Sequence, residues 1–150
     1  MKNKPLKIKP ACIEDLPFAK TLVRSNMHPY YVEHEMEWSD AGFHRGWESN
    51  SGFIAFIGDA RVGYFSVRRE PGVLYLPDMQ VISERCGQGI GRSMMRFIMD
   101  ELLTDDSRTL RLKVFKGNPA IHFYKKLGFI MAFSDERFSG MEYKAAQAAT

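Results

Sequence analysis

Three glycines within five positions, directly before a stretch with helical periodicity, constrain this chain more than any other feature. The segment ERCGQGIGRSMMRFIM, residues 84–99, contains Gly87, Gly89 and Gly91. A strand that ends near Ile82, followed by a loop and a helix that begins near Gly89, directs several unpaired N–H groups and the positive end of the helix dipole at one place. Glycine lets an anion approach the main chain there and permits a positive φ. The segment predicts a phosphate-binding turn; glycines that serve only a tight strand-to-helix turn are the alternative.

Two familiar phosphate motifs do not match this loop. The spacing is Gly-x-Gly-x-Gly rather than the Gly-x-Gly-x-x-Gly of dinucleotide-binding turns, and the chain has no Gly-x-x-x-x-Gly-Lys-Ser/Thr. The loop therefore indicates a phosphate without identifying the molecule that carries it.

The hydrophobic periodicity predicts alternating strands and helices. The run GFIAFIGDARVGYFSVRREPGVLYL is typical of consecutive hairpins, with turns at Gly58-Asp59 and Pro71-Gly72. Around it we expect a strand at 6–9, a helix from about 14 to 24, a helical face over 27–38, a helix over 90–102, a strand at 110–115, a helix at 119–127, and strands at 129–133 and 138–144. The predicted order is β-α-α-β-β-β-α-β-α-β-β, which is a mixed α/β (α+β) sheet.

Composition limits the class of protein. The chain has 150 residues, of which 45% are hydrophobic and 26% charged, as expected of one globular domain. We predict a single domain over 1–150, with a core at about 6–144 and a frayed tail at 145–150. Since no apolar run is long enough for a signal peptide or a membrane span, we expect a cytoplasmic protein with no membrane partner.

Charge, cysteine and histidine patterns exclude three further classes. The net charge is +3 and the Lys and Arg residues are scattered, so no nucleic-acid partner is expected, although a small polyanionic ligand fits. Cys12 and Cys86 have neither metal-type spacing nor the density of a disulfide scaffold, which predicts reduced thiols. The four histidines lack the spacing of a zinc site, and we expect no metal.

Two motifs taken together resemble the GCN5-related N-acetyltransferase (GNAT) family. They are MQVISERCGQGIGRSMM and, downstream, LRLKVFKGNPAIHFYKKLGF. The family signature is a strand that ends in an apolar-x-Val step, an Arg/Gln-x-x-Gly-x-Gly/Ala loop, and an Asn-x-Ala…Phe-Tyr…Gly-Phe segment. The resemblance covers about residues 6–143 and includes the predicted order of elements. It implies the acyl-CoA N-acyltransferase fold, with acetyl-CoA as co-substrate.

The resemblance also implies roles for individual residues. In the family, the loop amides hold the pyrophosphate of acetyl-CoA, the splayed end of the fourth strand pairs with the pantetheine arm, and a tyrosine of the late helix faces the thiol. One position departs from the pattern: Cys86 stands where the family has Arg or Gln, with Arg85 displaced by one residue. The pattern thus supports phosphate binding by the backbone rather than by that side chain. The implied cofactor-binding residues are Val81, Cys86, Gly87, Gln88, Gly89, Ile90, Gly91, Arg92, Ser93, Asn118 and Tyr124.

Acetyl transfer from a thioester to an amine needs a base for the ammonium and an acid for the departing thiolate. Asp78 is the candidate base, acting directly or through a water chain, and strand alternation places it with Gln80 on the face opposite Val81. Tyr124 is the candidate acid because a phenol can protonate a thiolate. A turn carboxylate and a core aromatic are the alternative interpretations. Pro77 cannot donate to a ladder and predicts that the strand begins or bulges there.

The resemblance also implies that the segment after the first helix lines the acceptor cleft, as it does in similar enzymes. Its acidic patch would favour a cationic amine and its aromatic residues would wall the pocket; an exposed charged helix face and a core aromatic stripe are the alternatives. The acidic residues are Glu33, Glu35, Glu37 and Asp40, and the aromatic residues are Tyr30, Tyr31, Trp38 and Trp47.

These inferences together predict an acetyl-CoA-dependent N-acetyltransferase, an acyltransferase that transfers groups other than aminoacyl groups. The acceptor is expected to be a primary amine of a small molecule or peptide, which attacks directly within a ternary complex. A non-catalytic acyl-CoA-binding sensor and a nucleotide-binding domain that uses the same glycine loop are the alternatives. The chain is expected to be a monomer or a homodimer.

Overall fold

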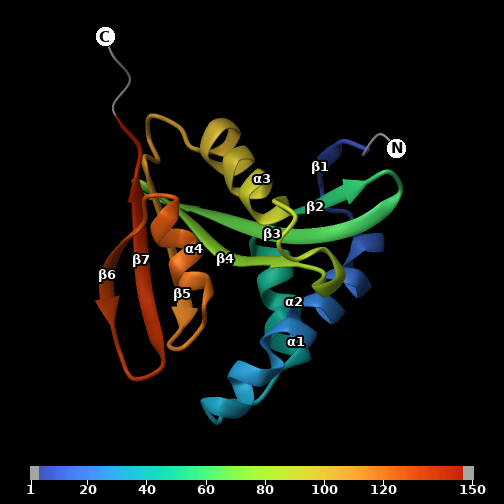
Figure 1. The fold of residues 1–150 in the computed structure, drawn as a ribbon, viewed down its shortest axis with the longest axis horizontal. Coiled ribbons are helices and arrows are strands. Elements are labelled where there is room, and N and C mark those ends of the chain that lie inside the picture. The colour runs from blue at the N-terminus through green and yellow to red at the C-terminus, as the bar shows by residue number, and fades with distance from the viewer. Residues whose placement is uncertain (1–3, 147–150) are drawn as a thin grey trace.

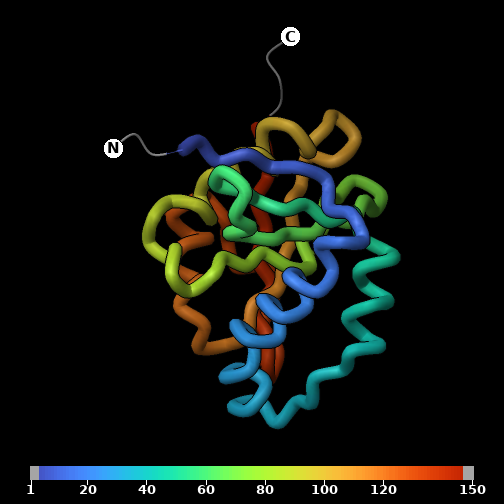
Figure 2. The backbone as a smooth tube through the Cα atoms, turned by 90° about the vertical axis from the view of Figure 1, so that its right-hand side faces the viewer, coloured from blue at the N-terminus to red at the C-terminus, as the bar shows by residue number. Residues whose placement is uncertain are grey.

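Seven strands form one mixed sheet in the computed structural model, which describes residues 4–146 (Figure 1, Figure 2). The strand order is β1-β2-β3-β4-β5-β7-β6. Every neighbouring pair is antiparallel except β4 with β5, which are parallel. The strands are β1 (Leu6–Pro10), β2 (Ser51–Ile57), β3 (Ala60–Glu70), β4 (Val73–Val81), β5 (Thr109–Phe115), β6 (Ile130–Ser134) and β7 (Phe138–Lys144).

Four α-helices pack against the two faces of this sheet. They are α1 (Leu16–Glu33), α2 (Asp40–Ser49), α3 (Ile90–Phe97) and α4 (Ala120–Lys126). One buried apolar cluster joins the sheet to α3 and α4, and a second joins α1 to Ile54 and Tyr64 of the sheet. The predicted mixed α/β class and the predicted order of elements are confirmed. The position of the second helix is wrong, because residues 27–33 of the predicted face belong to α1 and the second helix is α2.

Short turns form where the sequence predicted them. Gly58 and Gly72 have φ angles of 61° and 74°, which a residue with a Cβ rarely adopts, and they connect β2 to β3 and β3 to β4. The prediction that the first helix ends near Arg24 is wrong, because α1 continues through Pro29 to Glu33. Proline removes only one helical N–H donor, and the aromatic packing of the following turn against β5 holds the helix together.

The sheet splits between its fourth and fifth strands. Only three residue pairs join β4 to β5, from Val73 opposite Thr109 to Tyr75 opposite Arg111. Directly after Tyr75, two residues of β4 stand opposite one residue of β3, which is a β-bulge at Leu76 and Pro77. Proline has no N–H for the ladder, and the bulge lies where the sequence predicted it. Beyond the bulge, β4 and β5 diverge.

The C-terminal end of the described chain is tied to the residue that precedes β5. At the C-terminal end, Ala145 N donates to Arg108 O at 2.9 Å, and Arg108 Nη1 donates to Ala146 O at 2.8 Å. The rest of the predicted frayed tail, 147–150, lies outside the described residues. No helix within residues 4–146 combines the length and the apolar character needed to cross a membrane.

Candidate active site

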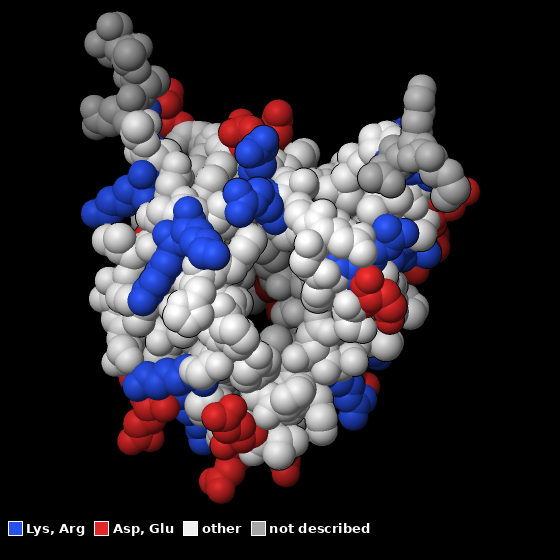
Figure 3. Space-filling model, viewed as in Figure 1, with Lys and Arg blue, Asp and Glu red and all other residues white. Residues whose placement is uncertain are grey.

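A cavity of about 1050 Å³ opens where β4 and β5 diverge. Figure 3 shows its mouth as a hollow near the centre of the molecule, with basic side chains above it and an acidic side chain visible at depth. Its walls come from both strands, from the loop after β4 and from α1, α3 and α4. Of the residues predicted to form the site, the lining includes Asp78, Val81, Cys86, Gly87, Gly89, Ile90, Gly91, Arg92, Asn118 and Tyr124.

The glycine loop presents bare backbone to this cavity. Gly87 and Gly89 have φ angles of 81° and 85°, and a Cβ built on either one would meet no atom within 4 Å. Within the described chain, no hydrogen bond uses the N–H groups of residues 87–92; the first helical bond runs from Ser93 N to Gly89 O at 3.0 Å. Unpaired N–H groups at a helix N-terminus are a site for an anion.

The two cations of this part of the lining are Arg85 and Arg92. Cys86 is exposed, and its thiol donates to Ile82 O at 3.5 Å. A thiol has no positively charged form and therefore adds no cation to the loop. Arg85, the next residue back, instead brings a guanidinium to the loop, where its Nη1 donates to Gln88 Oε1 at 3.3 Å. A positive charge thus lies one residue before Cys86.

Two residues of the predicted loop set do not line the cavity. The Gln88 side chain turns back along the loop, where its amide donates to Glu84 O at 3.5 Å. Ser93 is exposed on the first turn of α3. Gly91 does line the cavity, and a Cβ there would make an ordinary contact, 3.5 Å from the ring of Phe123 on α4.

Asp78 projects from the face of β4 that packs against α1. It stands opposite Ser66 of β3, and Gln80, two residues further on, accepts a hydrogen bond from Asn26 of α1 at 3.1 Å. Val81 packs on the other face, against the cluster that contains α3. The predicted alternation of side chains along this strand is thus found, although the bulge precedes it.

Burial sets the protonation behaviour of Asp78. Because no ion pair offsets the cost of desolvation, burial raises the pKa of its carboxyl to about 7. It is the one acidic residue in the cavity lining of the described chain. The Ser66 hydroxyl opposite it is fully buried and has no hydrogen-bond partner among residues 4–146. A carboxyl in such surroundings exchanges a proton near neutral pH.

Tyr124 reaches the same cavity from α4, on the other side of the sheet. Burial first, and then the charge of Asp78, raise its pKa to about 12, so the phenol keeps its proton at physiological pH. The same two causes, in the same order, raise the pKa of Tyr31 on α1. The cavity thus holds a carboxyl that ionises near pH 7 and a protonated phenol within electrostatic range of it.

The last two turns of α1 form the far wall of the cavity. Tyr30 and Tyr31 line it, as predicted for the acceptor side, together with Met27 and Met36. The other two predicted aromatic wall residues, Trp38 and Trp47, do not line it, because they pack against the second core cluster beside Phe43.

The predicted acidic patch does not line the cavity either. Asp40 accepts from Trp38 Nε1 at 2.6 Å and lies 3.7 Å from Lys20 Nζ and 3.9 Å from Arg24 Nη1. These partners lower the pKa of Asp40, the Trp38 hydrogen bond most of all. The other three members, Glu33, Glu35 and Glu37, are exposed. The four predicted acidic residues therefore lie outside the cavity lining, and the acidic residue that does line the cavity is Asp78 on β4.

Comparison with known proteins identifies the family. The family model described as acetyltransferase (GNAT) family matches residues 19–129, well over half of the chain. The chain belongs to the GNAT family. No curated protein sequence matches it.

Solved structures with the same fold include several acetyltransferases. The PaiA N-acetyltransferase of Thermoplasma acidophilum, in complex with coenzyme A, has a TM-score of 0.75 and 18% identity, over 93% of this chain and 99% of that one. The ribosomal-protein-S18-alanine N-acetyltransferase of Escherichia coli has a TM-score of 0.74 and 23% identity, over 97% of both chains. Arabidopsis thaliana Naa50, in complex with the bisubstrate analogue CoA-Ac-MVNAL, has a TM-score of 0.72 and 19% identity, over 93% of this chain and 98% of that one. At these identities the likeness concerns the fold.

Two further positions of the GNAT motif have structural partners in this chain. Asn118 Oδ1 accepts from Ala120 N at 2.9 Å and so caps the start of α4, the helix that carries Tyr124. Val81 O accepts from Asn26 Nδ2 at 3.1 Å, which ties α1 to the end of β4. The sequence had given no sign of Asn26, since the contact joins residues 55 positions apart.

Buried Asp78 is expected to cost the GNAT fold stability at alkaline pH. Its pKa is 3.8 ordinarily and about 7 here, so between these values the folded chain binds more protons than the unfolded chain, and stability falls as pH rises. This difference in pKa corresponds to at most about 4 kcal/mol of lost folding free energy above pH 7. Asp78→Asn should therefore raise the Tm at pH 8.5 and have little effect at pH 4.5, as measured by circular dichroism. A Tm difference that does not change with pH would contradict this account.

Proposed function

We propose that the protein is an acetyl-CoA-dependent N-acetyltransferase whose acceptor, a primary amine, attacks directly within a ternary complex. The observation that carries the proposal is the placement of Asp78 and Tyr124. They enter one cavity from opposite sides of the split sheet, Asp78 on the α1 side and Tyr124 from α4. A base and an acid placed in this way suit a transfer in which the acceptor and the leaving thiol approach from opposite sides.

The glycine loop fits the pyrophosphate of acetyl-CoA. The open space beside Gly87 and Gly89 gives a phosphate access to the main chain, and the unpaired N–H groups of residues 87–92 are hydrogen-bond donors for it. Arg85 and Arg92 add positive charge. Coenzyme A or its analogue in the PaiA and Naa50 structures supports the same choice of acyl donor. The thioester supplies the activated acetyl group, and the chain supplies binding, orientation and proton transfer.

Two side chains handle the protons. Above pH 7 the Asp78 carboxylate is ionised and accepts the proton that an incoming ammonium must lose. The Tyr124 hydroxyl, protonated because its pKa is about 12, donates to the departing sulfur. PaiA and the S18-alanine enzyme are both N-acetyltransferases, which supports an amine as acceptor.

Acetyl-CoA should stabilise the folded protein more than ATP or NAD at equal concentration. A ligand that binds only the native state adds about 2.7 kcal/mol at a hundredfold excess over Kd, which corresponds to a rise in Tm of roughly 5–10 °C for a chain of this size. Differential scanning fluorimetry measures the shift. A larger shift with either nucleotide would instead support a nucleotide-binding domain.

Gly89→Val should abolish this shift, because its Cβ would occupy the space that faces the phosphate. Gly72→Val is the matched control: Gly72 has a similar φ of 74°, compared with 85° for Gly89, and the same open surroundings, but it lies in the β3–β4 turn. Both variants carry the same backbone strain, and only the first should lose acetyl-CoA. Binding that survives Gly89→Val would refute the role of the loop. Binding without release of free thiol with any amine would favour a sensor over an enzyme.

A further inference from the structure

The half of the cavity that faces α1 has apolar walls. Seen from Asp78, the surrounding side chains come from α1, the turn after it, and the ends of β5 and β7. Most of them are aromatic rings and thioethers; the amides of Asn26 and Gln80 also line this half and bond to each other, with Asn26 Nδ2 donating to Gln80 Oε1 at 3.1 Å. The aromatic and thioether set comprises Met27, Tyr30, Tyr31, Met36, Phe115 and Phe138. We call this set the acceptor wall.

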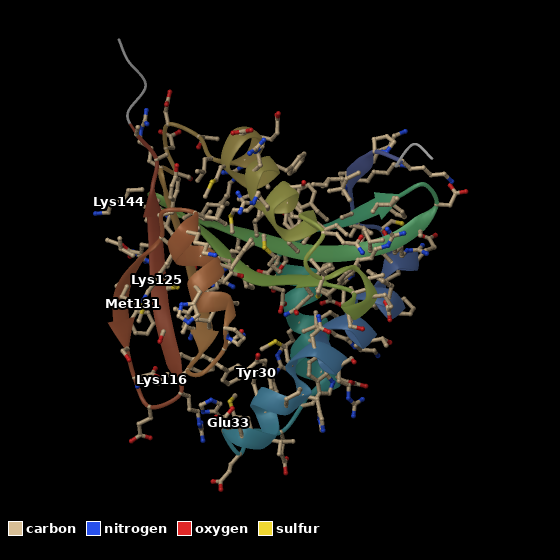
Figure 4. The ribbon with its side chains drawn as sticks, in the orientation of Figure 1. Tyr30, Glu33, Lys116, Lys125, Met131 and Lys144 are labelled. Carbon is tan, nitrogen blue, oxygen red and sulfur yellow. The ribbon has the colours of Figure 1, made fainter. Side chains whose placement is uncertain are left out.

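Phe115 closes the far end of the acceptor wall. Its ring stacks on Tyr30 at 5.9 Å and 6°, and it meets Tyr31 edge-on at 5.6 Å and Phe138 at 4.6 Å, measured between ring centroids. His34 stacks on the same ring at 5.0 Å, and its Nε2 lies 3.2 Å from Lys116 O. Figure 4 shows Tyr30 and Lys116 close together where α1 meets the end of β5. These contacts hold the end of α1 against the end of β5 at this side of the cavity.

The cavity lining near the acceptor wall contains few charged side chains that could pair with a charged acceptor. Asp78 is its one acidic neighbour in the lining, whereas Arg85 and Arg92 lie at the glycine loop. Lys113 is the remaining cation of the lining, and its Nζ lies over the Phe138 ring, 5.0 Å from the centroid. One carboxylate can pair with one ammonium. A second ammonium would find no second carboxylate in the lining, and a carboxylate next to the bound ammonium would lie close to the Asp78 carboxylate, which repels it. Either second charge costs binding free energy.

We propose that the acceptor is a monoamine on an apolar skeleton, aromatic or branched aliphatic, with no second charged group. This inference rests on the proposed function and adds the class of substrate. Burial of the skeleton against the acceptor wall supplies binding free energy.

A panel of matched amines tests the class. With acetyl-CoA saturating at pH 8, kcat/KM from thiol release is measured for 2-phenylethylamine, 3-methylbutylamine, 1,4-diaminobutane, L-phenylalanine and an uncapped tetrapeptide. The first two should exceed the others by about tenfold or more, because each of the other three brings a second charge into the pocket, and tenfold corresponds to about 1.4 kcal/mol. L-phenylalanine differs from 2-phenylethylamine only by its carboxylate, so their ratio isolates the second charge. A best rate with the diamine, the amino acid or the peptide overturns the inference and leaves the proposed function intact.

A charge placed in the acceptor wall should reverse the preference. Met36 follows Glu35, whose φ of 54° ends α1, and its side chain lines the cavity. Met36→Glu should lower kcat/KM for 2-phenylethylamine and raise it for 1,4-diaminobutane, changing their ratio by about tenfold or more, the factor that 1.4 kcal/mol represents. Met36→Leu, the matched apolar control, should leave the ratio unchanged. An equal effect of both variants on both amines would overturn the inference.

Equilibrium binding separates failure of the class from failure of the proposed function. Calorimetry of 2-phenylethylamine and of 1,4-diaminobutane against the CoA-loaded protein needs no turnover. Tighter binding of 2-phenylethylamine, weakened by Met36→Glu, would uphold the class even if no amine released thiol, and in that case only the proposed catalysis fails. Equal or weaker binding of 2-phenylethylamine would overturn the class whatever the rates show.

Discussion

Asp78→Asn is expected to lower kcat/KM by about 10²- to 10⁴-fold near pH 8, the usual scale for loss of a general base. Burial raises the pKa of Asp78 to about 7, so the carboxylate is protonated below that pH and ionised above it. The rate of the unmodified enzyme should therefore rise with pH through an inflection near 7, and the variant should lack this inflection. Its deficit should narrow toward pH 10, where the free amine becomes abundant.

The pH profile distinguishes a base from a merely structural carboxyl. Glu37→Gln, which removes an exposed acid outside the cavity lining, should leave both the rate and the profile unchanged. A deficit of Asp78→Asn that is the same at every pH would assign Asp78 to binding or folding. Because the substitution should also raise the Tm at alkaline pH, loss of rate in a more stable protein could not be attributed to unfolding.

The sequence predicted the parts of the site that depend on neighbours along the chain. Gly87 and Gly89 are needed for their positive φ and open surroundings, and Ile90 begins the helix that the periodicity indicated. Both signals lie within a few residues of the feature they specify. Pro77 likewise marked the bulge, because the missing N–H is a property of that residue alone.

The acceptor side could not be predicted in the same way, because it depends on contacts between distant segments. In the sequence, Phe115 has the pattern of an ordinary strand residue. Its place in the acceptor wall follows only from its stacking on Tyr30, 85 positions earlier in the chain. The acidic residues after α1 seemed suited to a cationic acceptor, yet the fold pairs Asp40 with Lys20 and Arg24 outside the cavity. Composition alone does not show which side of a helix end faces the cleft.

The surroundings of Asp78 could be predicted only in part. Alternation along β4 predicted that it points away from Val81, but only the packing of α1 makes that face a buried one. The pKa near 7 results from this packing and has no local sequence signal. A carboxyl in a strand becomes a candidate base through the helix that covers it.

Tyr124→Phe is expected to lower turnover by about 10²-fold, the scale for loss of a general acid, with little change in acetyl-CoA affinity. The variant keeps the ring, which packs against Phe123 at 5.3 Å and Phe129 at 5.5 Å, and removes only the hydroxyl. Because the pKa of Tyr124 is about 12, the phenol is protonated throughout the assay range. The deficit should therefore be constant from pH 6 to 10, in contrast to that of Asp78→Asn.

Tyr143→Phe provides the matched control for this prediction. Tyr143 packs on the same Phe129 ring, at 5.7 Å, but does not line the cavity. The same chemical change at that position should leave turnover unaltered. Pre-steady-state measurement of thiol release locates the effect, since loss of the acid slows the chemical step and leaves donor binding unchanged. If Tyr124→Phe and Tyr143→Phe turn over equally fast, Tyr124 serves the core, and the departing thiolate must take its proton from solvent or from another group.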